Sequence, residues 1–214
     1  MRLRPVAISV LSIALIFILP FAAFGQDSPN YFALKAGILS PTGDLDDGGF
    51  DTGFDGEIAY GHYFNPNFAL EVGLGYYLSD ASVSGFDPVL LGSFREEDDI
   101  TVIPITVTGK GIYPSGNFEL FAEVGVGIYF ADFEGVLTSS TLGTIRVDDD
   151  DFVFGGHLGV GASYNISKNV FLGVGAKYIL TSEAEFQGAA LGAPIKIEGD
   201  LNGFILTANL GFRF

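Results

Sequence analysis

Two histidines are the side chains of this sequence best suited to general-base chemistry near neutral pH. Nucleophilic hydrolysis requires a serine, a histidine and a carboxylate that converge in space. His62 and His157 are the two positions around which such a site could be built. A catalytic role therefore depends on which faces of the fold these two residues occupy.

Clustered carboxylates offer a second kind of chemistry, because dense oxygen ligands suit Ca²⁺ or Mg²⁺. The clusters lie at 44–47, 96–99 and 148–151. Their spacing does not match an EF-hand loop, which requires a central glycine and a closing glutamate. We therefore favour solvated, mutually repelling surface charge over a divalent-ion site, and we predict no metal centre and no cofactor.

The first residues of the chain indicate export. Arg2 and Arg4 precede an apolar run at 6–19, and a small-residue site at 23–25 follows. This is the organisation of a secretory signal peptide, and the run is shorter than the roughly 20 residues of a membrane-spanning helix. We predict a cleaved signal peptide at 1–25 and one domain at 26–214.

The charge of the domain excludes some partners. Removal of 1–25 takes away two arginines, so the formal net charge changes from −16 to −18. A nucleic-acid partner is not expected at this charge. Hydrophobic residues nevertheless make up 48% of the chain, and mean hydropathy is +0.40, so apolar and acidic residues must be segregated. Cysteine is absent, so no disulfide supports the fold.

Between acidic segments the sequence alternates with a period of two residues, which is typical of strands with one apolar face. Three connections are short and rich in Pro, Gly and Asn, whereas the other four are long and acidic. Short periplasmic turns and long extracellular loops are the pattern of outer-membrane barrels. We predict an all-β fold, an eight-stranded antiparallel up-and-down transmembrane β-barrel. Its strands are expected at 31–39, 53–64, 68–78, 100–113, 118–130, 152–164, 170–181 and 203–214.

The position of the charges predicts which face meets lipid. In 68–78 the apolar residues alternate with a set that includes Glu71, and in 118–130 they alternate with a set that includes Glu119 and Glu123. A soluble barrel would show the reverse, with apolar residues inside. The uncharged face therefore predicts lipid contact, and aromatic residues near strand ends predict interfacial girdles.

The other face predicts a charged lumen. Repeats such as Val72-Gly73-Leu74-Gly75 place glycines inward on four strands, and this leaves room for long side chains from neighbouring strands. A lower layer is expected to hold Lys35, Glu71, Lys110, Glu119, Glu123 and Arg213, and an upper layer Asp55, Glu57, His157 and Lys177. Buried charges persist when they are paired, so we favour a plug of ion pairs over a gated conduit.

Several stretches resemble a known family. They are Tyr31–Gly37, Pro41–Asp44 and Gly61–Glu71, together with a last strand that ends in Phe214. The chain resembles the outer membrane protein β-barrel domain superfamily, nearest its OmpW-like and opacity-porin-like members. OmpW-like relatives imply passage of small hydrophobic molecules through an apolar lumen. The charged lumen predicted here fits better a barrel resembling the OmpA transmembrane domain, which is closed by internal salt bridges.

A catalytic role is not expected on this fold. The stretch at His62 is similar to the His-x-Ser-Asn motif of lipid A deacylases, but Phe64 occupies the serine position. His157 falls on the predicted lumen face, away from lipid. We therefore predict that the protein is not an enzyme.

The resulting hypothesis is an integral barrel of the bacterial outer membrane with a structural or surface-interaction role and a plugged lumen. The alternatives are a narrow pore or OmpW-like transporter for small solutes, and an adhesin or receptor that uses acidic extracellular loops. Expected partners are outer-membrane lipid, lipopolysaccharide and the outer-membrane assembly machinery, whose recognition signal a C-terminal aromatic such as Phe214 resembles. We expect a monomer. The fourth long connection could form a rim hairpin through 184–186 and 195–197.

Overall fold

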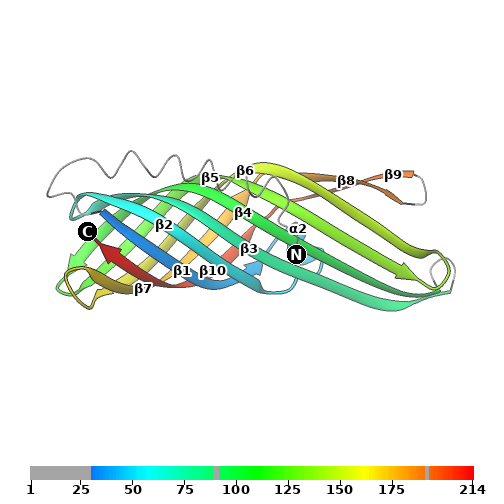
Figure 1. The fold of residues 1–214 in the computed structure, drawn as a ribbon, viewed down its shortest axis with the longest axis horizontal. Helices are drawn as coiled ribbons and strands as arrows, with labels where there is room; N and C mark the ends of the chain where they lie inside the picture. Colours follow the sequence, from blue (N-terminus) through cyan, green and yellow to red (C-terminus); the bar gives the residue numbers. More distant parts are fainter. Residues whose placement is uncertain (1–29, 89–91, 191–192) are drawn as a thin grey trace.

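A computed structural model describes residues 30–88, 92–190 and 193–214, which form a long β-barrel (Figure 1). The predicted signal peptide at 1–25 lies outside the described residues. The barrel strands are β1 (Asn30–Pro41), β2 (Gly53–Asn65), β3 (Phe68–Asp87), β4 (Gly92–Ser115), β5 (Phe118–Ser139), β6 (Gly143–Asn165), β7 (Val170–Thr181) and β10 (Gly203–Arg213). A short helix, α2 (Asp44–Asp47), and a hairpin of β8 (Ala184–Ala190) and β9 (Ala193–Gly199) complete the described elements.

The sheet closes on itself in the order β1-β10-β7-β6-β5-β4-β3-β2, with each strand antiparallel to its neighbours. The last strand joins the first over a register that runs from Tyr31↔Arg213 to Pro41↔Gly203. Backbone bonds between Asn30 and Phe214 complete this seam at 2.9 and 3.1 Å. The predicted eight-stranded up-and-down topology is confirmed. In the part of the chain that the structure describes, no helix has the length and apolar character needed to cross a membrane.

The apolar residues cover the outside of the barrel, as the alternation predicts. Leu34, Val124 and Val160 expose 56%, 67% and 61% of their surface, although all three are aliphatic. Such a surface is stable only against lipid, because a soluble protein rarely exposes a continuous apolar band. Aromatic pairs mark both rims of the band: Phe118–Tyr164 near the short turns and Tyr178–Phe204 near the other end.

Two acidic connections were predicted as loops, and the structure corrects this interpretation. Residues 79–87 and 92–99 continue β3 and β4, and residues 131–139 and 143–151 continue β5 and β6. The register persists through them, for example at Asp99↔Glu134 and Glu134↔Asp148. Strand pairing continues here because residues such as Ala81 and Phe133 are buried on one face, while acids such as Asp80 and Asp99 are exposed on the other.

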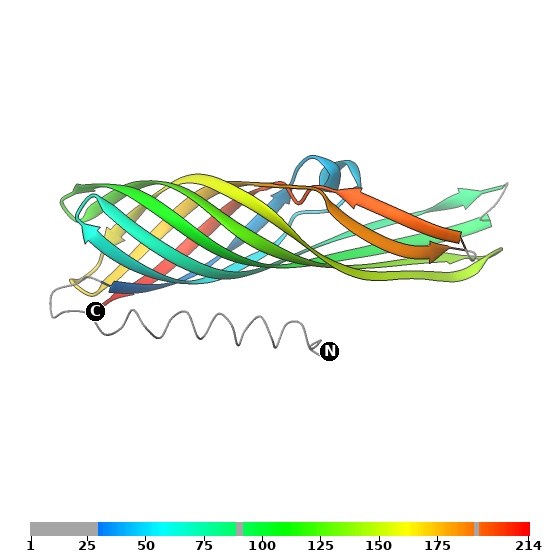
Figure 2. The same ribbon diagram turned by 90° about the horizontal axis from the view of Figure 1, so that it is seen from above.

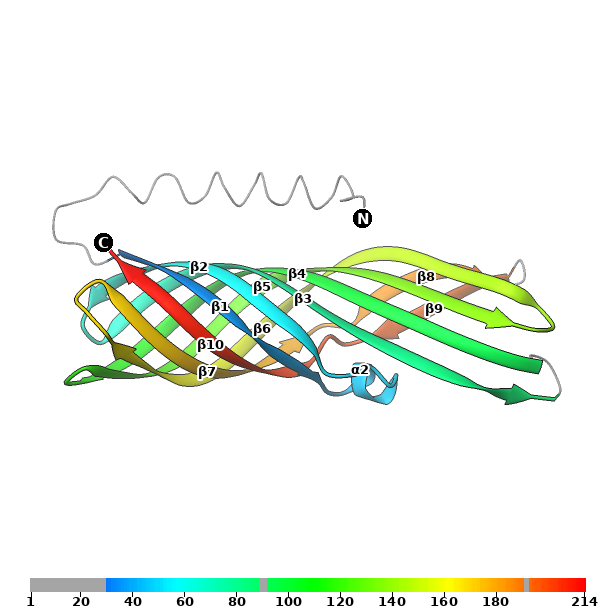
Figure 3. The ribbon, with the colours of Figure 1, turned by 60° about the horizontal axis from the view of Figure 1, so that its bottom comes forward.

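The lengthened strands form a four-stranded sheet. This sheet projects beyond the rest of the barrel, away from the chain's C-terminus (Figure 3). We call residues 80–87, 92–99, 132–139 and 143–150 the extracellular extension. The fourth long connection forms the β8–β9 hairpin, a separate two-stranded sheet with pairs from Ala184↔Gly199 to Ala190↔Ala193. Figure 2 shows this hairpin and the extension reaching in the same direction, away from the short turns.

Candidate functional site

A chain of ion pairs crosses the inside of the barrel. Lys35 on β1 lies directly opposite Glu57 on β2, and its Nζ is 2.6 Å from Oε1 of Glu57. The same ammonium contacts Glu71 on β3. Glu71 is in turn 2.9 Å from Nζ of Lys110 on β4. Two lysines and two glutamates therefore connect four neighbouring strands, β1 to β4.

The chain extends at both ends. Lys110 is also 3.3 Å from Glu123, its direct cross-strand partner on β5. At the other end, Nζ of Lys177 on β7 is 2.8 Å from Oε2 of Glu57. No side chain in this set exposes more than 13% of its surface. We call this set the central ion-pair chain: Lys177, Glu57, Lys35, Glu71, Lys110 and Glu123.

A second cluster lies nearer the short turns. Arg213 donates to Oε2 of Glu119 at 2.9 Å and to the hydroxyl of Tyr63 at 3.1 Å. It also donates to Oδ1 of Asn165 at 2.6 Å, and its guanidinium lies 4.6 Å from the ring centre of Phe171. The grouping differs from the two predicted layers, because Lys35 reaches its opposite partner Glu57. The upper and lower charges thus form one chain, while Glu119 and Arg213 stand apart.

Two predicted lumen residues do not join either set of ion pairs. Asp55 is 2% exposed, and its Oδ2 has no hydrogen-bond partner among the described residues. Nε2 of His157 lies 3.0 Å from the hydroxyl of Thr108. Nδ1 of the other histidine, His62, lies 2.8 Å from Oδ1 of Asn30. Within the described ranges, neither histidine is hydrogen-bonded to a serine.

The inward glycines make room for the charged side chains, as the repeat suggests. A Cβ placed on Gly73 would lie 2.9 Å from Oε1 of Glu57, and one on Gly159 would lie 3.0 Å from Oε1 of Glu123. A Cβ on Gly125 would lie 2.4 Å from the ring of His157. Any larger residue at these positions would displace a member of the charged interior.

An apolar layer lies above the central ion-pair chain, and sequence reasoning missed it. Tyr77, Val102, Tyr129 and Ile205 are each no more than 1% exposed and belong to one cluster, the upper apolar cluster. The available signal was the inward parity near the upper strand ends, where the side chains change from charged to apolar. The hairpin contributes to the cluster through Phe186, whose ring stacks on that of Phe133 at 5.4 Å.

Two small cavities lie inside the barrel. One of about 30 Å³ is lined by residues that include Tyr31, Lys35 and Asn209, and another of about 10 Å³ lies beside Lys110 and Lys177. Such volumes hold about one or two water molecules each. Side chains of the central ion-pair chain, among them Lys35 and Lys110, line both cavities.

A larger hollow lies outside the barrel, between β6 and the hairpin. It measures about 610 Å³ and is lined by Asp149, Asp150, Asp151, Glu183, Glu185 and Gln187. Oδ2 of Asp151 accepts from the backbone N–H of Glu185 at 2.9 Å, and Oδ2 of Asp149 accepts from that of Gln187 at 2.7 Å. These carboxylates thus hold the hairpin. Across residues 30–88, 92–190 and 193–214, no three acids or histidines are grouped to hold a metal ion.

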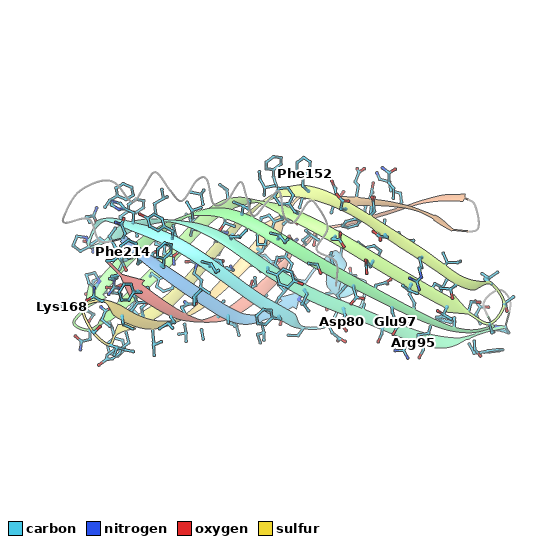
Figure 4. All side chains as sticks on the ribbon, viewed as in Figure 1. Asp80, Arg95, Glu97, Phe152, Lys168 and Phe214 are labelled. Atoms are coloured by element: carbon cyan, nitrogen blue, oxygen red, sulfur yellow. The ribbon has the colours of Figure 1, made fainter. Side chains whose placement is uncertain are left out.

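The electrostatics of the extension differ from those of the interior. Burial, together with the neighbouring carboxylates of Glu96 and Asp99, raises the pKa of Asp98 to about 6. Figure 4 shows charged side chains such as Asp80, Arg95 and Glu97 along this sheet, whereas Phe152 lies at its base and Phe214 at the opposite end. Phe214 is 50% exposed and stacks on Phe32 at 5.4 Å, on the lipid-facing side.

The closed antiparallel barrel, its lipid-facing apolar band and its polar interior define an integral outer-membrane β-barrel protein. Comparison with known proteins agrees. The chain belongs to the outer membrane protein beta-barrel domain family, which it matches over residues 10–214. This is a family mainly of non-enzymatic barrels, and the protein is located in the bacterial outer membrane.

The chain is similar to an uncharacterised protein of Coxiella burnetii, with 30% identity over 144 residues. The match covers 59% of this chain and spans 57% of the Coxiella protein. Two solved structures share the fold. The outer membrane protein OprG of Pseudomonas aeruginosa has a TM-score of 0.56 at 16% identity, with 87% of this chain and 96% of OprG covered. Neisserial surface protein A has a TM-score of 0.51 at 14% identity, with 88% and 100% covered.

Proposed function

We propose that this protein is a barrel with a closed lumen, and that it serves the outer membrane as a structural or surface-interaction protein. The observation that carries the proposal is the central ion-pair chain, because its contacts run from Lys177 on β7 to Glu123 on β5 through the middle of the lumen. The upper apolar cluster lies above this chain inside the barrel. A solute would have to displace both.

The energetics of buried charge support a plug. Taking a charge out of water is costly, and the cost is offset only when each charge has partners. Glu71 meets this condition, since it is 1% exposed and contacts Lys35, Lys110 and the hydroxyl of Tyr31. Removing one partner from such a set costs about 3–5 kcal/mol, so thermal opening of the chain is rare.

A narrow pore or OmpW-like transporter is the second candidate. It is favoured by the likeness in fold to OprG, although that likeness extends to the fold alone. An adhesin or receptor role is the third, and the extracellular extension supports it because paired strands can present a defined surface. We also propose that the protein is a monomer, is not an enzyme, and contacts lipopolysaccharide and the assembly machinery, the latter through Phe214.

Single-channel recording in planar bilayers tests the closed lumen. We expect no steady openings from the wild-type protein or from Glu97→Gln, whose side chain is exposed on the extension. Glu123→Gln, inside the lumen, is the matched variant. Stable wild-type openings whose conductance changes in Glu123→Gln but not in Glu97→Gln would reject the plug and favour the pore.

A further inference from the structure

The extracellular extension has two sheet edges, one along β6 and one along β3, and they differ in whether another element covers them. A strand edge presents unpaired backbone N–H and C=O groups, which natural proteins normally cover or disrupt. Along β6 the hairpin provides this cover. Asp149 and Asp151 bind backbone N–H groups of β8, which lies against β6 there.

The opposite edge belongs to β3. Pairing of β3 with β2 ends at Phe54↔Leu78, and the last backbone bond on this side runs from the N–H of Asp51 to the oxygen of Asp80 at 2.8 Å. Beyond Asp80, β3 continues to Asp87 with β4 on its other side. Among the described residues, no strand pairs with the free side of β3 between 82 and 86. We call Ser82–Phe86 the open edge.

The register fixes which backbone groups the open edge presents. In an antiparallel strand, successive residues direct their backbone groups to opposite sides. Since the oxygen of Asp80 faces away from β4, those of Ser82, Ser84 and Phe86 do so too. An independent contact agrees. The oxygen of Ser93 on β4 accepts from Ser140 and so faces β5, which leaves its partner Phe86 turned to the open side.

The open edge lacks the usual protection against strand addition. Its sequence is Ser-Val-Ser-Gly-Phe, without proline or lysine, and its register with β4 continues without a bulge from Tyr77 to Asp87. Small side chains at Ser82 and Ser84 leave the backbone accessible to another chain.

The surroundings of the open edge indicate the chemistry of its partner. On the outer face, Asp80 lies opposite Asp99, and Ser82 lies opposite Glu97. On the inner face, Val83 is 52% exposed beside Ala81, with Glu96 and Asp98 on the next strand. A strand added here would place alternate side chains next to acids on one face and next to an exposed valine, flanked by acids, on the other.

We propose that the open edge of β3 is a docking site for an extended segment of another protein, one that alternates basic and apolar residues. The inference rests on the proposed surface-interaction role and names its site. Strand addition satisfies the backbone groups of Ser82, Ser84 and Phe86, and the basic side chains meet Asp80, Glu97 and Asp99. A second copy of this chain is disfavoured as the occupant, because the acidic faces of two copies would repel each other. Each domain has a net charge of −18, which is −16 for the whole chain minus the two arginines of 1–25.

Binding of a peptide to the full mature protein in detergent micelles tests the proposal. The probe is a short labelled peptide that alternates lysine and valine, and fluorescence anisotropy measures its affinity. We expect saturable binding that weakens as salt increases. A glutamate–valine peptide should not bind. A lysine–valine peptide that is N-methylated at alternate residues should bind at least about tenfold more weakly, because it loses backbone donors.

Variants of Ser84 locate the site. Proline at an edge position removes the outward N–H and blocks pairing, so Ser84→Pro should weaken binding about tenfold or more, whereas Ser84→Ala should stay within about twofold of wild type. Heat-dependent gel mobility checks that each variant is folded, and Ser82→Pro replaces any variant that is not. Equal binding by Ser84→Pro and Ser84→Ala, or by the methylated and unmethylated peptides, would overturn the proposal. Channel recordings need no peptide. A conducting lumen, which would reject the closed-lumen proposal, would therefore be detected independently of peptide binding.

Discussion

The membrane-spanning half of the barrel and the extracellular extension use the same alternation of side chains with opposite results. In the membrane the charges point inward and form ion pairs, as with Lys35 and Glu57, while the apolar residues point out to lipid. In the extension the outer face carries exposed acids such as Asp80 and Asp99, and the buried residues are those on the inner face, such as Ala81 and Phe133. The strands do not change direction between the two halves. The medium around them changes from lipid to water, and the residue types on each face change with it.

The two halves also differ in how they treat like charges. Inside the barrel every glutamate of the central ion-pair chain contacts a lysine. On the extension, acids lie directly opposite one another at Asp80↔Asp99 and Asp99↔Glu134. Like charges opposite each other destabilise a sheet by a few tenths of a kcal/mol to about 1 kcal/mol, a cost that water and salt reduce. The membrane half therefore fixes the fold, and the extension carries a charge pattern that its own stability does not require.

The largest effect is expected from removing a charge in the membrane half. Glu71→Gln leaves the ammonium groups of Lys35 and Lys110 with fewer partners in a buried site. We expect a loss of about 3–5 kcal/mol in the free energy of unfolding. Urea unfolding in lipid vesicles, followed by tyrosine fluorescence, measures it.

The matched control lies on the extension. Glu97→Gln removes a carboxylate that is 2.7 Å from Arg95, but both side chains are more than half exposed. An exposed pair of this kind contributes about 0–1 kcal/mol. Equal losses from Glu71→Gln and Glu97→Gln would end the distinction between the two halves.

A smaller effect is expected where the hairpin meets the extension. Asp149→Ala removes the acceptor for the backbone N–H of Gln187 and should destabilise the hairpin contact by about 0.5–1.5 kcal/mol. Hydrogen exchange at the amides of Glu185 and Gln187 should become faster, while the barrel strands stay protected. Asp150→Ala is the control, since Asp150 lies between Asp149 and Asp151 and points to the opposite face. Faster exchange in Asp150→Ala to the same extent would show that bulk charge, not the bond, holds the hairpin.

The sequence predicts the membrane half well and the extension poorly, for one physical reason. Lipid forces strict alternation, so residues such as Val124 and Glu123 reveal their faces directly. Cross-strand pairs such as Lys110 and Glu123 could also have been found, had the register been known. Above the membrane both faces meet water, and acids such as Asp98 and Asp99 occupy both, so the period of two is masked. The upper apolar cluster was not predicted because its residues come from the ends of several strands and from the hairpin. Their contacts with one another depend on the strand register, which the sequence alone does not give.

The smallest effect concerns pH and belongs to the extension alone. The pKa of Asp98 is raised to about 6 by burial, Glu96 and Asp99, while its cross-strand partners Ala81 and Gly135 carry no charge. A carboxyl whose folded pKa lies above its unfolded value binds its proton more tightly when folded, so its ionisation destabilises the fold. The stability of the extension should therefore be highest near pH 4 and should fall as pH rises through about 6.

Because Asp98 is partly exposed, its own share of this change should stay below about 1 kcal/mol. Asp98→Asn removes the share and should flatten the pH dependence of hydrogen exchange in the upper part of β4. Exchange at amides within the membrane band should show no such change. If Asp98→Asn leaves the profile of the extension as steep as in wild type, the negative field at this end comes from the acids as a group. The open edge of β3 would then attract a cationic partner through the whole acidic surface and not through the carboxylates nearest to it.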